Sequence, residues 1–221
     1  MKGTMQTKRI QNIKQAAVIA AAALLLAGCG TTAGYKQADK TGEGIARFRE
    51  DIVTGKQAID QTVTALGQVQ VTADTNPRKA FQAYSKAVDN LDSAAANVRK
   101  SAQEMQAQGQ AYFANWEKQL AAIQNEQIRT LAVQQRAKLQ ETFASIKRVA
   151  EPLKTQFDPW MSDMKDLQKY LSNDLTIAGV DAAKTLITKT QNEGREVQKS
   201  MDALVAELNS VAAAITPATK K

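Results

Sequence analysis

Apolar residues recur at alternating steps of three and four over most of the chain, from residue 45 to residue 215. This spacing places them along one face of an α-helix, whereas a half-buried strand needs alternation at every second residue, which no segment shows. Short polar segments near residues 74, 125 and 175 separate four such stretches. The pattern therefore predicts an all-α protein of four long helices.

Each predicted helix carries one continuous stripe of apolar and small side chains. The stripes are, in chain order, Ile45, Phe48, Ile52, Gly55, Ile59, Thr62, Leu66 and Val69; then Phe81, Tyr84, Val88, Leu91, Ala95, Val98, Ala102, Met105, Gly109, Tyr112 and Trp116; then Leu139, Phe143, Ile146, Ala150, Leu153, Phe157, Trp160, Met164, Leu167 and Leu171; and finally Val180, Ala183, Ile187, Thr190, Gly194, Val197, Met201, Leu204, Leu208, Val211 and Ile215. Sustained steps of three and four are typical of coiled-coil-like packing. Because the connections are short, we expect an elongated antiparallel bundle.

The connections carry turn signals of unequal strength. Residues 72–77 end in a proline placed to start the second helix, and Ser172, Asn173 and Asp174 together with Gly179 indicate the last reversal. The apolar phase slips after Trp116, and we place the middle reversal at residues 124–125. A single longer helix that absorbs the slip as a stutter is the alternative.

Two prolines fall inside the third predicted helix. Its stripe stays in phase across Pro152 and Pro159. Each proline removes one backbone hydrogen bond and clashes with the preceding turn. We therefore expect one bent helix rather than two separate ones.

Fixing the three turns at residues 74, 125 and 175 also fixes the relative heights of the helices. Five residues then form one expected core layer: Gly55, Ala95, Phe157, Trp160 and Gly194. Glycine inside a helix costs about 1 kcal/mol relative to alanine, so glycines on a buried seam indicate close packing. We expect the two aromatic side chains to fill the space beside the small residues. The same alignment of the helices places Gly109 opposite Phe143.

The first 29 residues have a different pattern. Residues 1–15 are polar and basic, and residues 16–27 form an unbroken run of twelve apolar side chains that ends in Gly28 and Cys29. A membrane-spanning helix needs about 20 apolar residues, so this run is short for an anchor. A basic segment followed by a short apolar one is typical of a secretory signal peptide.

The sequence Leu26-Ala27-Gly28-Cys29 resembles the lipobox of bacterial lipoproteins. The resemblance implies cleavage between Gly28 and Cys29, removal of residues 1–28, and attachment of lipid to the Cys29 thiol. Polar, Gly- and Thr-rich residues follow, so we expect residues 29–44 to form a lipidated, flexible tether ahead of one helical domain at 45–215. An uncleaved hydrophobic anchor, or an ordinary buried cysteine, is the alternative.

The resemblance to lipoproteins also implies a location. Gly30 follows the cysteine, and it is not the Asp that commonly retains such proteins in the inner membrane. We expect an outer-membrane lipoprotein that faces the periplasm, provided that the source has two membranes. The membrane partner is then bound through the N-terminal lipid.

Charge and composition narrow the function classes. The 221 residues carry a net charge of +7, but four basic residues and no acidic ones lie within the first fifteen. The remainder is close to neutral and has no basic stripe with interleaved aromatic side chains, so we expect no nucleic-acid partner. The chain has no His and a single Cys, which removes the commonest general base and metal ligand. We expect no enzyme activity, no cofactor and no metal.

The C-terminal residues 216–221 end in Lys220 and Lys221. A lipid-anchored heptad protein that ends in Lys resembles the major outer-membrane lipoprotein whose terminal Lys is joined to peptidoglycan. That resemblance implies a peptidoglycan contact, and a frayed basic tail is the simpler interpretation.

From about Glu43 to Ile215 the order of features resembles the uncharacterised bacterial domain of unknown function 2959 family. The segments that carry the resemblance are Trp116 to Leu120, Glu151 to Leu153 with Phe157, and Lys169 to Asn173. The resemblance implies a helical bundle and supplies no catalytic residues.

Two function classes follow from these observations. The first is a non-enzymatic, lipid-anchored bundle that acts as a spacer, scaffold or adaptor in the cell envelope and has a protein partner there. The alternative is a periplasmic binding module for an apolar ligand or a client polypeptide, and a cell-wall hydrolase is a distant third. A sizeable apolar cavity favours the ligand binder, a continuous exposed apolar groove favours the adaptor, and a filled core with a polar surface favours the spacer. The sequence leaves the oligomeric state open.

Overall fold

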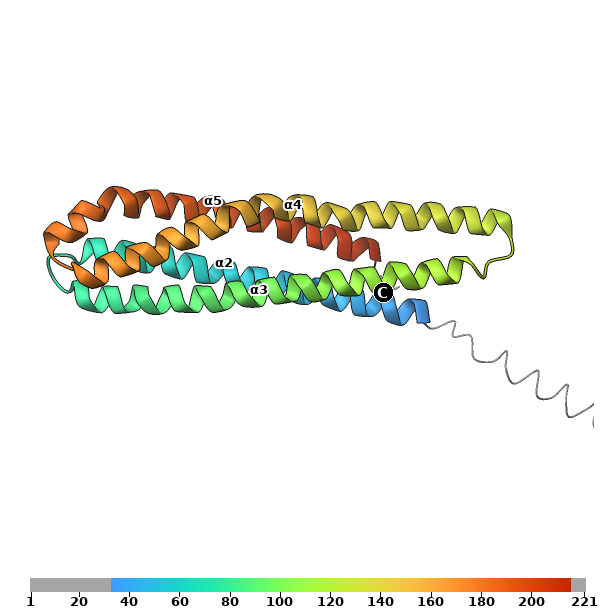
Figure 1. Cartoon of the computed structure of the whole chain (residues 1–221), viewed down its shortest axis with the longest axis horizontal. Coiled ribbons are helices and arrows are strands. Elements are labelled where there is room, and N and C mark those ends of the chain that lie inside the picture. The colour runs from blue at the N-terminus through green and yellow to red at the C-terminus, as the bar shows by residue number, and fades with distance from the viewer. Residues whose placement is uncertain (1–32, 216–221) are drawn as a thin grey trace, which may run out of the picture. The chain divides into compact units, whose positions relative to one another are not determined.

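The computed structural model describes residues 33–215, which form four helices and contain no strand. These are α2 (Ala33–Val71), α3 (Pro77–Leu120), α4 (Glu126–Asn173) and α5 (Ile177–Ile215). The chain divides into residues 1–36 and a compact unit of residues 37–221, in which the helices pack as a bundle with antiparallel neighbours (Figure 1). The predicted all-α bundle of four long helices is confirmed.

Hydrogen bonds across each seam define the order of the helices around the bundle. In every seam a buried or half-buried side chain donates to a backbone carbonyl of the next helix. The donors and acceptors are Thr62 Oγ1 to Ala87 O (3.1 Å), Tyr84 OH to Met164 O (2.6 Å), Trp160 Nε1 to Thr190 O (2.8 Å) and Gln191 Nε2 to Val63 O (3.3 Å). The helices therefore follow one another as a ring, α2 beside α3, α3 beside α4, α4 beside α5 and α5 beside α2. Burial raises the pKa of the Tyr84 hydroxyl well above its usual value.

Asparagine caps fix where α3 and α4 begin. The side chain of Asn76 accepts a hydrogen bond from the Lys79 amide, with Pro77 at the first helical position, and Asn125 accepts one from the Ile128 amide. Each cap satisfies one backbone N–H that has no partner inside the helix. The reversal predicted at residues 124–125 is confirmed, and the single longer helix is wrong.

The last connection is held by Asp174 and Thr176. The Asp174 carboxylate accepts hydrogen bonds from the hydroxyl and the amide of Thr176, and these bonds lower its pKa. The Thr176 hydroxyl in turn accepts from the Gly179 amide at 3.1 Å. Gly179 lies buried in the first turn of α5, so it belongs to the helix rather than to the reversal.

The flexible tether predicted for residues 29–44 is wrong over residues 33–44, which belong to α2. Ala38 and Thr41 are buried and extend the stripe that continues at Ile45. The Thr41 hydroxyl donates to Gln37 O at 2.8 Å within the helix and lies 3.5 Å from Gln108 O of α3. Small and hydroxyl side chains serve as core here, and a pattern based on apolar residues does not detect them.

The core follows the predicted stripes closely in α2 and α5, where every member of both stripes is buried. It thins toward the α3–α4 turn, and the first buried residue of α4 is Ile146, twenty positions into the helix. Two helices alone cannot enclose a core, so the side chains near this turn remain partly exposed.

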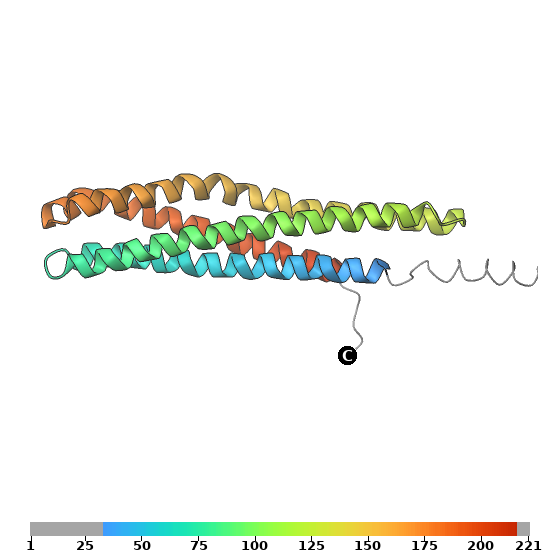
Figure 2. The same ribbon diagram turned by 60° about the horizontal axis from the view of Figure 1, so that its bottom comes forward.

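Helix α4 runs unbroken through both prolines and is visibly bowed (Figure 2). Pro152 and Pro159 provide no N–H for the carbonyls four residues earlier, at Arg148 and Thr155. The Thr155 hydroxyl lies within hydrogen-bond distance of the carbonyls of Glu151 and Pro152, at 3.2 and 3.0 Å. The bent helix that the sequence predicts is thus present.

Trp160 and Gly194 meet at the seam between α4 and α5. A Cβ atom at Gly194 would lie 3.1 Å from Cζ2 of Trp160 and 2.8 Å from Cγ2 of Val63. Trp160 is fully buried, and its indole N–H is satisfied by Thr190 O. The absent side chain at Gly194 therefore provides the space that the indole ring occupies.

Replacing Gly194 with Leu should destabilise the bundle, because the new side chain overlaps Trp160 and Val63. Overpacking of this kind costs about 1–3 kcal/mol, which lowers the melting temperature of a protein this size by roughly 3–10 °C. Ala203→Leu, at an exposed position of the same helix, is the matched control and should change the melting temperature by less than about 2 °C. Thermal unfolding followed by circular dichroism measures both, and equal melting temperatures would reject the close packing.

Candidate functional site

An apolar groove with a volume of about 630 Å³ lies between α3 and α4. Its floor comes from α2 and α5 and its two walls from α3 and α4. The residues that line it with apolar or small side chains are Phe48, Gly55, Leu91, Ala95, Val98, Ala102, Met105, Gly109, Phe113, Phe143, Ala144, Ile146, Ala150, Leu153, Phe157, Met201 and Leu204. The volume lies within the range of about 300–1,000 Å³ that is common for small-molecule sites.

Small side chains in register on α3 make room for the groove. Ala95, Ala102 and Gly109 recur at steps of seven residues, which places them along one line of the helix. At Gly109 the missing side chain is replaced by the ring of Phe143, which would overlap any Cβ there. The same ring packs edge-on against Phe113, with centroids 5.8 Å apart.

The path of α4 opens the other wall. Two ion pairs between α3 and α4 bracket the groove, Glu117 with Arg136 at 2.8 Å and Asp92 with Lys165 at 2.9 Å. From one ion pair to the other, α3 covers 25 residues and α4 covers 29. Four additional residues correspond to about 6 Å of helix, consistent with the bow seen in Figure 2.

Charged and polar residues form the rim of the groove. Arg99 pairs with Asp158 at 2.9 Å, and its guanidinium lies 5.8 Å from the centre of the Phe157 ring. Lys147 and Lys154 are exposed on α4 beside the groove, with Glu151 between them. The interior is therefore apolar and the mouth is mixed in charge, with one more cationic than anionic side chain.

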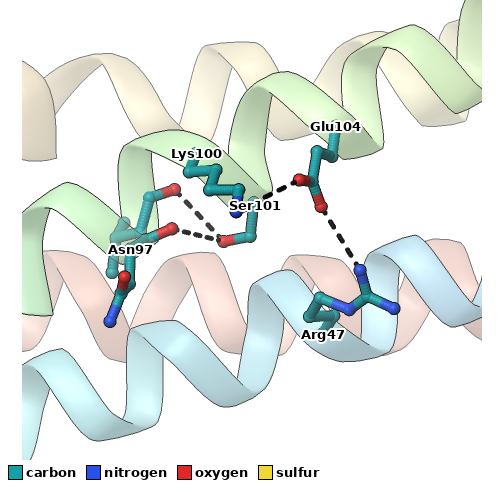
Figure 3. Close-up of polar contacts among 6 residues, drawn as sticks. Arg47, Asn97, Lys100, Ser101 and Glu104 are labelled. Carbon is teal, nitrogen blue, oxygen red and sulfur yellow. Dashed lines mark hydrogen bonds and ion pairs between the residues drawn. The ribbon is translucent and has the colours of Figure 1, made fainter.

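A second, polar pocket of about 190 Å³ lies between α2 and α3. Figure 3 shows its polar contacts: Glu104 pairs with Arg47 at 3.3 Å and with Lys100 at 4.0 Å, and Asp51 is the second acidic residue of the lining. The buried Ser101 hydroxyl lies within hydrogen-bond distance of the Asn97 and Val98 carbonyls. Because these groups bond to one another, we interpret the pocket as a polar contact that holds α2 and α3 together.

The structure divides the five residues of the expected core layer into two groups. Gly55, Ala95 and Phe157 line the groove, whereas Trp160 and Gly194 meet at the seam between α4 and α5. The nearest side chains to Gly55 are Met201 and Val98, so neither aromatic residue of the layer fills its space. Gly109 does face Phe143. Gly28, Cys29 and residues 216–221 lie outside the described residues.

Sequence reasoning missed the groove itself. The available signals were the line of small residues at 95, 102 and 109 and the two prolines of the facing helix. Separately these features indicate close packing and a bend. Only their position opposite one another, across the α3–α4 seam, makes a cavity.

Within residues 33–215, no group of His, Cys, Asp and Glu side chains could hold a metal ion. In the same part of the chain, no helix combines the length and the apolar character needed to cross a membrane. The chemistry that the groove offers is burial of an apolar group next to a polar rim.

Comparison with known proteins gives one match. The family model described as "Protein of unknown function (DUF2959)" matches residues 31–215, which include all four helices. No match to a curated protein or to a solved structure was found. The bundle with its α3–α4 groove is therefore the matched region, and the chain belongs to the DUF2959 family of proteins of unknown function.

Proposed function

We propose that this chain is a lipid-anchored, non-enzymatic protein of the cell envelope that holds one long acyl chain in the groove between α3 and α4. The observation that carries the proposal is the apolar groove of about 630 Å³ between these helices. A bundle that serves only as a spacer needs a filled core and gains nothing from such a groove.

The envelope location rests on the N-terminal sequence. Residues 16–27 form a short apolar run after a basic segment, and the one cysteine of the chain stands directly after Gly28. Lipid on Cys29 would anchor the protein to a membrane, with each buried methylene contributing about 0.8 kcal/mol. Gly30 favours the outer membrane in a source with two membranes, where the bundle would face the periplasm.

The width of the groove favours a single chain as its occupant. Its lining on α3 extends from Leu91 to Phe113, which is about 33 Å of helix. The volume of about 630 Å³ is spread along this length, so the groove is long and narrow. A long, narrow apolar groove suits a slender chain better than a compact ligand.

The chemistry of the lining favours a hydrocarbon over an extended peptide. Every residue of a peptide other than proline brings one N–H and one C=O that must be satisfied when they are buried. The groove offers polar groups only at its rim, where Gln106 and Gln110 lie exposed. An acyl chain has no such groups along its length. Burying about twelve methylenes would contribute roughly 10 kcal/mol before the cost of association.

A structural spacer, scaffold or adaptor is the second candidate. It is supported by the length of α3, whose 44 residues span about 66 Å, and by ion pairs that bridge neighbouring helices. The two candidates are compatible, because a long lipid-anchored bundle can also carry an acyl chain. A protein partner in the envelope and a peptidoglycan contact through Lys220 or Lys221 belong to this second proposal.

Cys29→Ala should abolish metabolic labelling of the chain by a palmitate analogue, because no other thiol is available for acylation. The measurement compares label per molecule in the wild type and the variant after growth with the analogue. Ser101→Ala, which leaves the N-terminus intact, is the control and should keep full label. Unchanged labelling of Cys29→Ala would contradict the anchor.

Filling the groove should displace the acyl chain. Ala102→Trp places an indole inside the groove, whereas Ala96→Trp places the same group on an exposed position of α3. Cells grow with a photoactivatable, alkyne-tagged fatty acid, and after irradiation the full chain is digested for peptide mass spectrometry. We expect light-dependent label on peptides from 91–113 and 143–158, reduced at least fivefold by Ala102→Trp and unchanged by Ala96→Trp.

Peptide mapping separates this label from the lipid on Cys29, which needs no irradiation. Melting temperatures of the two variants establish that each is folded. The absence of light-dependent label on α3 and α4, or equal label in both variants, would reject the groove as an acyl-chain site and leave the spacer.

A further inference from the structure

Exposed apolar side chains cluster at the turn between α3 and α4. Eight large hydrophobic residues of the described chain are exposed, and three of them lie within six positions: Ile128 (55 %), Leu131 (60 %) and Val133 (49 %). Ile123 lies in the turn itself and is half-buried. We call residues 117–133 the hairpin tip.

The hairpin tip projects beyond the neighbouring helices. Thr41 of α2 lies opposite Gln108 of α3, and Arg47 lies opposite Glu104, so Gln37 is level with about residue 113. The turn at residue 125 is then about 18 Å further along the bundle axis. On the other side Glu207 of α5 bonds to Ser145, which leaves the first part of α4 without an α5 neighbour. Figure 1 shows this hairpin extending past the end of α5.

The tip lies at the end of the bundle from which the chain leads back to Cys29. Gln37 follows Cys29 by eight positions, and the last four of these steps, from Ala33 onward, belong to α2. The eight steps cover about 12 Å if all have helical rise and at most roughly 20 Å if the first four are extended. The 18 Å overhang of the tip falls between these limits. A lipid surface that takes up acyl chains at Cys29 is therefore within reach of Ile128 and Leu131.

We propose that the hairpin tip inserts its exposed apolar side chains into the same lipid surface that holds the Cys29 anchor. The proposal rests on the lipid anchor proposed above and is independent of the groove. A second contact at the membrane would hold the bundle upright, with the turns near residues 74 and 175 directed away from the surface.

The charge of the tip fits an anionic lipid surface. Residues 110–140 contain four basic and two acidic side chains. Both acids are paired, Glu117 with Arg136 and Glu126 with Arg129. The exposed Lys118 and Lys138 therefore give this end a net positive charge, and each cationic side chain near an anionic surface contributes about 1 kcal/mol.

The opposite end of the bundle provides a matched control. Ile177 is 61 % exposed there, as much as Leu131 at the tip. The two ends are separated by the length of α3, about 66 Å, so they cannot touch one flat membrane together. If exposure alone determined contact with the membrane, Leu131 and Ile177 would contact it equally. The proposal predicts contact at Leu131 and none at Ile177.

The experiment compares Leu131→Trp with Ile177→Trp in the full-length lipidated protein. Each variant is reconstituted in vesicles of phosphatidylethanolamine and phosphatidylglycerol, with and without a lipid spin-labelled near the head of its acyl chain. The wild type supplies the background of Trp116 and Trp160. We expect the spin label to reduce the added emission at least twofold in Leu131→Trp and to leave it unchanged in Ile177→Trp.

Flotation of the same vesicles separates the two proposals. A chain that floats with the vesicles but shows equal quenching at both sites overturns the tip contact and leaves the anchor intact. A chain that does not float overturns the anchor, and the tip contact that rests on it fails too. Both positions are exposed, so the fold should tolerate either substitution, and circular dichroism measures this.

Discussion

Two missing backbone hydrogen bonds in α4 determine the geometry of the most unusual part of this bundle. Pro152 and Pro159 lie seven residues apart, and neither can donate to the turn before it. Helix α4 nevertheless stays continuous and remains paired with α5, so its curvature opens the seam toward α3 instead. The groove lies along this curved part of α4, between Phe143 and Asp158.

Small residues have opposite roles in the two seams of α4. Toward α5, the space at Gly194 is occupied by Trp160, whose indole N–H is bonded to Thr190 O. Toward α3, the spaces at Ala95 and Ala102 face the outward curve of α4 and remain open. One seam is thus filled and holds α4 against α5, and the other leaves a groove between α4 and α3. This division is the physical basis for proposing a binding function rather than a purely structural one.

The stripes of α2 and α5 could be read from the sequence because a three-four repeat allows only one buried face, and every predicted stripe residue of these helices is buried. The start of α2 was missed because Ala38 and Thr41 form core without being strongly apolar. The groove was missed for a different reason. Whether Gly55 faces Phe157 or the side chains of Met201 and Val98 depends on how the other helices lie around α2, which the spacing of residues along the chain does not determine.

The two prolines of α4 hold the groove open, and the distance between α3 and α4 tests this role most directly. Spin labels on cysteines introduced at the exposed positions Gln103 and Arg148 report this distance in the full chain. In the double variant Pro152→Ala and Pro159→Ala, both backbone bonds can form, and we expect a shorter distance, a higher melting temperature and loss of light-dependent acyl-chain label from α3 and α4. An unchanged distance with full label would show that the prolines do not hold the groove open.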